Sequence, residues 1–242
     1  MKSILKVIYK QGFALSTALV VVISIVLLFP SCNSTQEPSP YGKDYVFGID
    51  VSKYQGEINW SQVGRHHPIE FVFIRATMGS NGKDAFFKRN WKGAQEEGFI
   101  RGAYHYYRPN ENSTQQFENF SSTVRLDSGD FVPVLDIEEE GDFGRDNLRM
   151  GVLNWLLLAE EVYGVKPIIY TGLTFYEHVL QGYVDDYPLW IAAYSGKDRL
   201  AGIPWTFHQF SDNVRVNGIT ANRVDGNDFN GSLSELDSFR IK

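Results

Sequence analysis

The segment FVPVLDIE, residues 131–138, is a nearly continuous apolar run that ends on two carboxylates, Asp136 and Glu138. Apolar strands of this kind are typical of a parallel sheet that is covered on both faces. Residues two apart on a strand face the same way, and their Cα atoms lie roughly 6–7 Å apart. The segment therefore predicts a buried strand, Phe131–Ile137, that brings a close pair of carboxyl groups to one end of a sheet.

Seven further segments share the β-branched and aromatic character of this strand. We expect these strands at Tyr45–Val51, Glu70–Ala76, Ile100–Tyr107, Pro167–Tyr170, Leu189–Ala193, Thr206–Phe210 and Arg223–Val224. Amphipathic stretches separate the first six strands, and one more follows the last strand. We expect these helices at Trp60–Arg65, Ala85–Glu97, Ser113–Leu126, Arg145–Tyr163, Leu173–Leu180 and Leu233–Phe239. Because each of the first five strands precedes a helix, the order predicts a closed α/β barrel.

Carboxyl groups from three distant segments fall at the same end of this predicted barrel. Asp50 ends the first strand, Asp136 and Glu138 end the fourth, and Asp225 lies beside the last. Functional residues of such barrels gather at the C-terminal ends of the strands. Two carboxyl groups that close resist joint ionisation, so one pKa should rise and leave an acid protonated near neutral pH. This arrangement suits glycoside hydrolysis, although an Asp at a strand end can instead cap a turn and a carboxylate cluster can bind a divalent cation.

Composition excludes several classes of protein. The chain has 242 residues, of which 43% are hydrophobic and 14% aromatic, as in an ordinary globular protein. Without residues 1–32 it has 20 basic and 29 acidic residues, a net charge of -9, which argues against a nucleic-acid partner. None of the five His forms a metalloprotease-type motif, and the chain has neither a phosphate-cradling Gly loop nor a serine nucleophile elbow. We therefore expect no metal and no cofactor.

The N-terminus has the pattern of an export signal. Three Lys precede an apolar run from Phe13 to Phe29, and the single Cys of the chain, Cys32, follows it. Residues 1–32 are interpreted as a signal peptide with a lipobox, in which Cys32 is lipidated, or as a soluble export signal or an uncleaved membrane anchor. The polar stretch 33–43 is typical of a linker. Residues 44–242 then form one barrel domain.

Three motifs together resemble the family 25 glycoside hydrolases, which are bacterial and phage muramidases. They are GIDVSKYQG at 48–56, VLDIE at 134–138 and VDGNDFNG at 224–231, in the order of that family. Weaker matches lie between them, at FIRAT (73–77), GAYHYYRP (102–109) and IYTG (169–172). The resemblance covers about residues 46–231. It implies a modified TIM-type barrel of eight strands and about five helices, (β/α)5(β)3.

The resemblance also implies an activity and roles for the four carboxyl groups. The substrate would be the glycan strand of peptidoglycan, cleaved at the β-1,4 bond between N-acetylmuramic acid and N-acetylglucosamine. Glu138 would be the general acid, and Asp136 would orient the acetamido group of the substrate or stabilise the charge that it develops. The acetamido oxygen would attack the sugar, with a protein carboxylate as the alternative nucleophile. Asp50 and Asp225 would complete the groove floor.

Four residues near strand ends are candidates for contact with sugar, with ordinary core packing as the alternative. They are Tyr107, Tyr170, Trp190 and Gln209.

Two other functions remain open from the sequence. One is a chitinase-like glycosidase, although Pro133 and Val134 stand where such barrels carry further Asp residues. The other is a glycan-binding module that has lost catalysis. In each case we expect an exported monomer in the cell envelope. It would be lipid-anchored in the periplasm or at the outer membrane, with the membrane as a partner through its N-terminus, or else secreted.

Overall fold

The computed structural model describes residues 45–66, 68–221 and 223–242. The expected signal or anchor segment at 1–32, its Cys32 and the linker at 33–43 lie outside these ranges. Within them, none of the helices is long and apolar enough to span a lipid bilayer.

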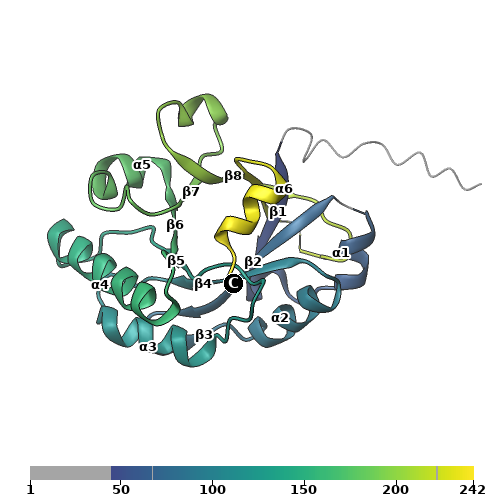
Figure 1. The fold of residues 1–242 in the computed structure, drawn as a ribbon, viewed down its shortest axis with the longest axis horizontal. Helices are drawn as coiled ribbons and strands as arrows, with labels where there is room; N and C mark the ends of the chain where they lie inside the picture. Colours follow the sequence, from purple (N-terminus) through teal and green to yellow (C-terminus); the bar gives the residue numbers. More distant parts are fainter. Residues whose placement is uncertain (1–44, 67, 222) are drawn as a thin grey trace, which may run out of the picture. The chain divides into compact units, whose positions relative to one another are not determined.

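A closed barrel forms the centre of the described chain (Figure 1). The sheet order is β1-β9-β8-β7-β6-β5-β4-β2-β3, and a further pairing of β1 with β2 closes the ring. The strands are β1 (Val46–Val51), β2 (Ile69–Met78), β3 (Gly82–Lys83), β4 (Ile100–Tyr106), β5 (Val134–Asp136), β6 (Ile168–Gly172), β7 (Leu189–Ala192), β8 (Trp205–Val214) and β9 (Val224–Phe229). Eight of them make the wall, and the two-residue β3 only pairs with the end of β2. The predicted eight-stranded barrel is thus confirmed, while the hairpin strand β3 was not expected.

Helices connect the first six wall strands and lie outside the ring, as Figure 1 shows for α2, α3 and α4. They are α1 (Trp60–His66), α2 (Phe87–Glu96), α3 (Ser113–Thr123), α4 (Arg145–Tyr163) and α5 (Leu173–Phe175), with α6 (Leu233–Leu236) near the C-terminus. Single turns are η1 (Lys53–Gln55), η2 (Tyr176–Leu180), η3 (Lys197–Leu200) and η4 (Asp237–Phe239). The longest, α4, ends at Gly164 with a left-handed φ of 70°, a conformation that glycine adopts without steric cost.

The last strand runs against its neighbours. Strands β1 to β8 of the wall pair in parallel, whereas β9 is antiparallel to both β8 and β1. The sheet is therefore parallel, as the apolar strands indicated, except at its last strand. A short connection after β8 returns the chain without a crossover helix, and this direct return requires an antiparallel strand.

Two predicted strands have different lengths in the structure. The strand expected at Phe131–Ile137 is only Val134–Asp136, because Pro133 has no backbone N–H to donate to a neighbouring strand. Phe131 makes an isolated bridge to Arg240 instead. The strand expected at Arg223–Val224 extends to Phe229.

Aromatic side chains fill the end of the barrel interior at which the parallel strands begin. Phe71, Phe73, Phe131 and Phe207 are fully buried and meet edge-on or tilted at centroid distances of 4.9 to 5.8 Å. The C-terminal α6 and η4 close this end, since Leu236 is buried among these rings and Val132 N–H donates to the Phe239 carbonyl. We call these four Phe residues the aromatic floor.

Candidate active site

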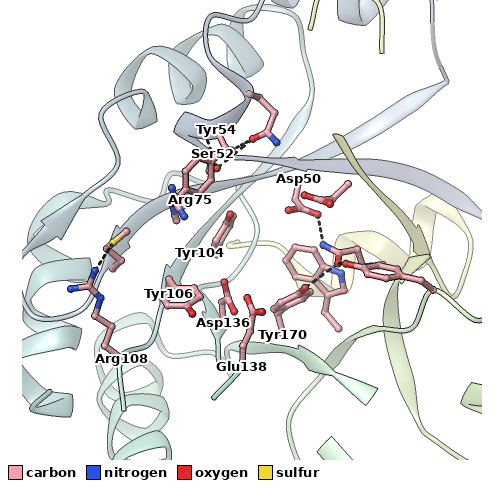
Figure 2. Close-up of a pocket in the computed structure, with 16 residues that line it drawn as sticks. Asp50, Ser52, Tyr54, Arg75, Tyr104, Tyr106, Arg108, Asp136, Glu138 and Tyr170 are labelled. Carbon is pink, nitrogen blue, oxygen red and sulfur yellow. Dashed lines mark hydrogen bonds between the residues drawn. The ribbon is translucent and has the colours of Figure 1, made fainter. Parts of the chain in front are cut away.

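A groove of about 480 Å³ lies where the parallel strands end (Figure 2). The opposite end of the barrel is the one that α6 closes. All four carboxyl groups that the sequence singled out line it: Asp50 on β1, Asp136 on β5, Glu138 just beyond β5 and Asp225 on β9. Asp225 lies near the start of its strand, but β9 is antiparallel and sets Asp225 directly opposite Asp50. We call these four residues the carboxyl rim.

Asp50 and Asp225 form one pair in the rim. Asp50 is buried and accepts hydrogen bonds from Gln209 Nε2 and Asn227 Nδ2, each at 2.9 Å. Burial raises the pKa of Asp50 to about 6, despite these bonds. Burial and the neighbouring Asp50 carboxylate raise the pKa of Asp225 to about 8. A proton on Asp225 therefore bridges the two carboxyl groups near neutral pH.

Asp136 and Glu138 form the second pair. Burial, followed by the charge of Glu138, raises the pKa of Asp136 well above its ordinary value. The Oδ1 atom of Asp136 is buried and has no hydrogen-bond partner within the described structure. Glu138 is more exposed than Asp136 and points into the groove (Figure 2). Partial desolvation by the groove wall raises its pKa too, while a hydrogen bond from Asp136 opposes that rise. One proton is therefore shared between the two carboxyl groups.

One buried cation faces the carboxyl rim, and the sequence analysis did not single it out. Arg75 lies on β2, donates from Nε to Asp84 Oδ2 at 3.0 Å and packs under the Tyr54 ring. Its charge lowers the pKa of Asp136, against the larger effect of burial. Arg75 continues the inward-facing series of Phe71 and Phe73, so the alternation of the strand was the signal that could have found it.

Gln209 ties the aromatic wall of the groove to the rim. Its Oε1 accepts hydrogen bonds from the hydroxyls of Tyr170 at 2.9 Å and Tyr194 at 2.6 Å, while its Nε2 donates to Asp50. Trp190 lies deeper and donates from Nε1 to Asn227 Oδ1 at 2.8 Å. The structure thus places Tyr170, Trp190 and Gln209 in the groove lining, as the sequence suggested, together with Tyr194, which the sequence analysis missed.

Tyr107 lies elsewhere, which corrects its assignment as a groove residue. It is buried in the helix layer, where its hydroxyl contacts Ser113 and lies over Gly151 of α4. Tyr106 and Tyr104 line the groove instead. Successive residues at the end of β4 point to opposite sides of the barrel wall, so a shift of one position moves a side chain from groove to core.

This geometry suits acid-assisted cleavage of an oxygen-linked bond. Two carboxyl pairs with raised pKa values line an open groove with aromatic walls, so a proton donor and an ionised partner can coexist near neutral pH. Among the described residues, no group of three or more His, Cys, Asp or Glu side chains is arranged to hold a metal ion.

Comparisons with known proteins agree with this geometry. The family model described as Glycosyl hydrolases family 25 matches residues 49–219. YegX of Escherichia coli (strain K12), an uncharacterized protein, is 42% identical over 199 residues, which cover 80% of this chain and 73% of that protein. Lysozyme M1 of Streptomyces globisporus is 36% identical over 209 residues, 79% of this chain and 70% of the enzyme. The crystal structure of the bacterial lysozyme from Streptomyces coelicolor superposes with a TM-score of 0.73 and 31% identity, covering 83% of this chain and 99% of that one.

Proposed function

The chain belongs to glycosyl hydrolase family 25, and on this premise we propose how its carboxyl rim cleaves the glycan strand of peptidoglycan. Its activity is that of a muramidase, as the motifs predicted: it hydrolyses the β-1,4 bond between N-acetylmuramic acid and N-acetylglucosamine. The observation that carries the proposal is the Asp136–Glu138 pair, in which the accessible member has a raised pKa.

Glu138 is the general acid. It points into the groove, where a glycosidic oxygen can approach, and burial favours its protonated form by raising its pKa. The proton that it shares with Asp136 passes to Glu138, which leaves Asp136 ionised. As the bond to the sugar breaks, the proton passes from Glu138 to the departing oxygen. The ionised Glu138 then accepts a proton from the water that completes hydrolysis.

Asp136 holds the acetamido group of the muramoyl sugar. Its buried Oδ1 lacks a partner, so the N–H of an acetamido group is a suitable donor to it. The acetamido oxygen then attacks the sugar carbon, and ionised Asp136 stabilises the positive charge that develops on the ring formed. This is the substrate-assisted variant of glycoside hydrolysis.

Asp50 and Asp225 act on the substrate through their shared proton. They lie opposite each other on neighbouring strands, and the charge of Asp50 contributes, after burial, to the raised pKa of Asp136 and of Tyr170. We assign to them hydrogen bonds with the hydroxyls of the bound sugar.

The test is digestion of purified peptidoglycan by the wild type and by Glu138→Gln. The amide keeps the shape and removes the proton donor, so release of reducing ends should stop while the far-UV spectrum and the melting temperature stay unchanged. Glu140→Gln, a change at a half-buried position two residues away that breaks an ion pair with Arg145, is the matched control and should keep full activity.

Mass spectrometry of the products separates the alternatives. Muramidase products end in reducing N-acetylmuramic acid. Products with reducing N-acetylglucosamine ends would favour a chitinase-like activity. The release of no reducing ends, by the wild type or by Glu138→Gln, would favour a glycan-binding module. Near-wild-type turnover of Glu138→Gln would contradict the assignment of the acid.

We further propose that the protein works as a monomer outside the cytoplasmic membrane, lipid-anchored at Cys32. The support is the export-like pattern of residues 1–32 together with a substrate that lies beyond that membrane. A labelled fatty acid should be incorporated into the full chain and not into Cys32→Ser. A mature N-terminus at another residue would contradict the anchor, and sedimentation velocity checks the monomer.

A further inference from the structure

A second cavity, of about 530 Å³, adjoins the groove at the ends of β6 and β7. Leu173 and Phe175 of α5 and Ala192 of β7 give it apolar walls, and Arg199 of η3 completes it. Its volume is within the range of sites that hold a small ligand. We call this the side cavity.

Tyr194 belongs to both spaces. It lines the groove and the side cavity, and it is largely exposed. Its hydroxyl is fixed by the 2.6 Å hydrogen bond to Gln209, which also donates to Asp50. The groove and the side cavity therefore meet at Tyr194. A substituent of a substrate that is held against Asp50 can pass Tyr194 and enter the side cavity.

The two spaces differ in their charged residues. Four carboxyl groups and two arginines, Arg75 and Arg108, line the groove, which leaves an excess of acidic groups, whereas Arg199 is the only charged residue among the described residues that line the side cavity. Arg199 is exposed, and within the described part of the chain no carboxylate forms an ion pair with it. An anionic substituent of the substrate is thus repelled by the carboxyl rim and attracted by Arg199 in the side cavity.

We propose that the side cavity binds the acidic peptide attached to the muramoyl sugar, with Arg199 pairing with a peptide carboxylate. This rests on the proposed muramidase function and adds the part of the substrate that the groove does not hold. The peptide branches from the glycan, carries free carboxylates and includes small apolar side chains. Those features match a cation and the apolar walls of Leu173 and Ala192.

The test uses soluble, uncross-linked glycan strands in two forms, with their peptides and after an amidase has removed them. Arg199→Gln should raise KM for the peptide-bearing strands roughly three- to tenfold, the effect of losing one charge-assisted contact, and leave kcat unchanged. KM for the stripped strands should not change. Arg199→Lys should restore most of the affinity, because it keeps the charge.

Arg215→Gln is the matched control. Arg215 is exposed, lines none of the cavities described here and forms no ion pair within the described ranges, so its loss changes the net charge by the same amount. It should leave KM for both substrates unchanged.

Gly172→Leu is an independent variant that fills the side cavity without changing charge. Gly172 has a φ of -70°, which any residue adopts, and a Cβ there meets no heavy atom within 4 Å. The variant should fold normally and should selectively weaken binding of the peptide-bearing strands.

Two results would overturn the inference: an Arg199→Gln protein that behaves like Arg215→Gln on peptide-bearing strands, or one that loses affinity equally for both forms. The wild type still cleaves both forms in either case. A wild type that cleaves neither form would overturn the proposed function instead.

Discussion

The aromatic floor and the carboxyl rim are two layers of one barrel interior and are built by the same strands. The floor contributes stability, whereas the rim contributes the chemistry of the site. On β2, Phe71 and Phe73 face the floor, and Arg75, two residues further, faces the rim. On β8, Phe207 and Gln209 divide in the same way. Burial of the rings in the floor stabilises the fold, because apolar surface leaves water. Burial of the carboxyl groups in the rim destabilises it, because their charged forms lose hydration.

The raised pKa values indicate that burying the carboxyl groups of the rim lowers the stability of the fold. Asp50, Asp136, Glu138 and Asp225 all bind protons more tightly in the fold than in water, chiefly because burial disfavours their charged forms. Each ionisation therefore destabilises the fold. The floor must offset this strain, so changes in the two layers should separate stability from activity.

The largest effect is expected in the floor. Phe73→Ala removes a fully buried ring that stacks on Trp190 at 4.5 Å and meets three other Phe rings. Such truncations lower the free energy of unfolding by about 3–5 kcal/mol. Urea titration should show this loss, and activity per folded molecule at low temperature should stay near that of the wild type. A loss of turnover without a loss of stability would break the division.

The reverse pattern is expected in the rim. Asp136→Asn removes the charge that stabilises the developing cation, so kcat should fall roughly 100- to 1000-fold. The free energy of unfolding at pH 8 should not fall, because the variant no longer buries a carboxylate. Asp186→Asn, an exposed change in the turn before β7, is the control and should alter neither. Unchanged turnover of Asp136→Asn would make Asp136 a purely structural residue.

A smaller effect is expected in the pH dependence of stability, which depends on the rim and not on the floor. The pKa of Asp225 is raised to about 8, so the folded protein retains a proton that the unfolded chain has lost. Stability then falls as pH rises, by about 2 kcal/mol between pH 6.5 and 8 at about 1.4 kcal/mol per pKa unit. Below pH 6.5 the buried His105, whose pKa is lowered to about 4, has the opposite effect.

Urea midpoints at pH 6.5 and 8 measure this fall directly. Asp225→Asn should reduce the fall in stability over this interval, and Phe73→Ala should leave it unchanged. A wild type whose stability does not change over this interval would mean that the rim is already ionised in the fold.

The rim could be predicted from the sequence because it follows strand ends within short motifs. Asp50, Asp136, Glu138 and Asp225 each stand next to an apolar run, and the barrel topology brings such ends together. The polar residues that position them were harder to find. Arg75 and Asn227 lie inside strands, and their contacts, such as Asn227 with Asp50, join residues that are far apart in the sequence. Only the closed barrel defines those neighbours.

Register was the other limit, and it leads to the smallest prediction. Tyr106 and Tyr107 are adjacent and chemically identical, yet Tyr106 lines the groove and Tyr107 packs against α4. Period-two alternation separates them, but the sequence does not show which of the two faces inward at the end of β4. Tyr107→Phe should lose its contact with Ser113 and about 1 kcal/mol of unfolding free energy, with KM unchanged. Tyr106→Phe should keep full stability and raise KM a few-fold, since its hydroxyl reaches only Glu139 at 3.5 Å and is otherwise free to contact sugar. Urea titration and KM for peptidoglycan fragments check the pair, and the opposite assignment of the two effects would mean that the strand register differs from that described.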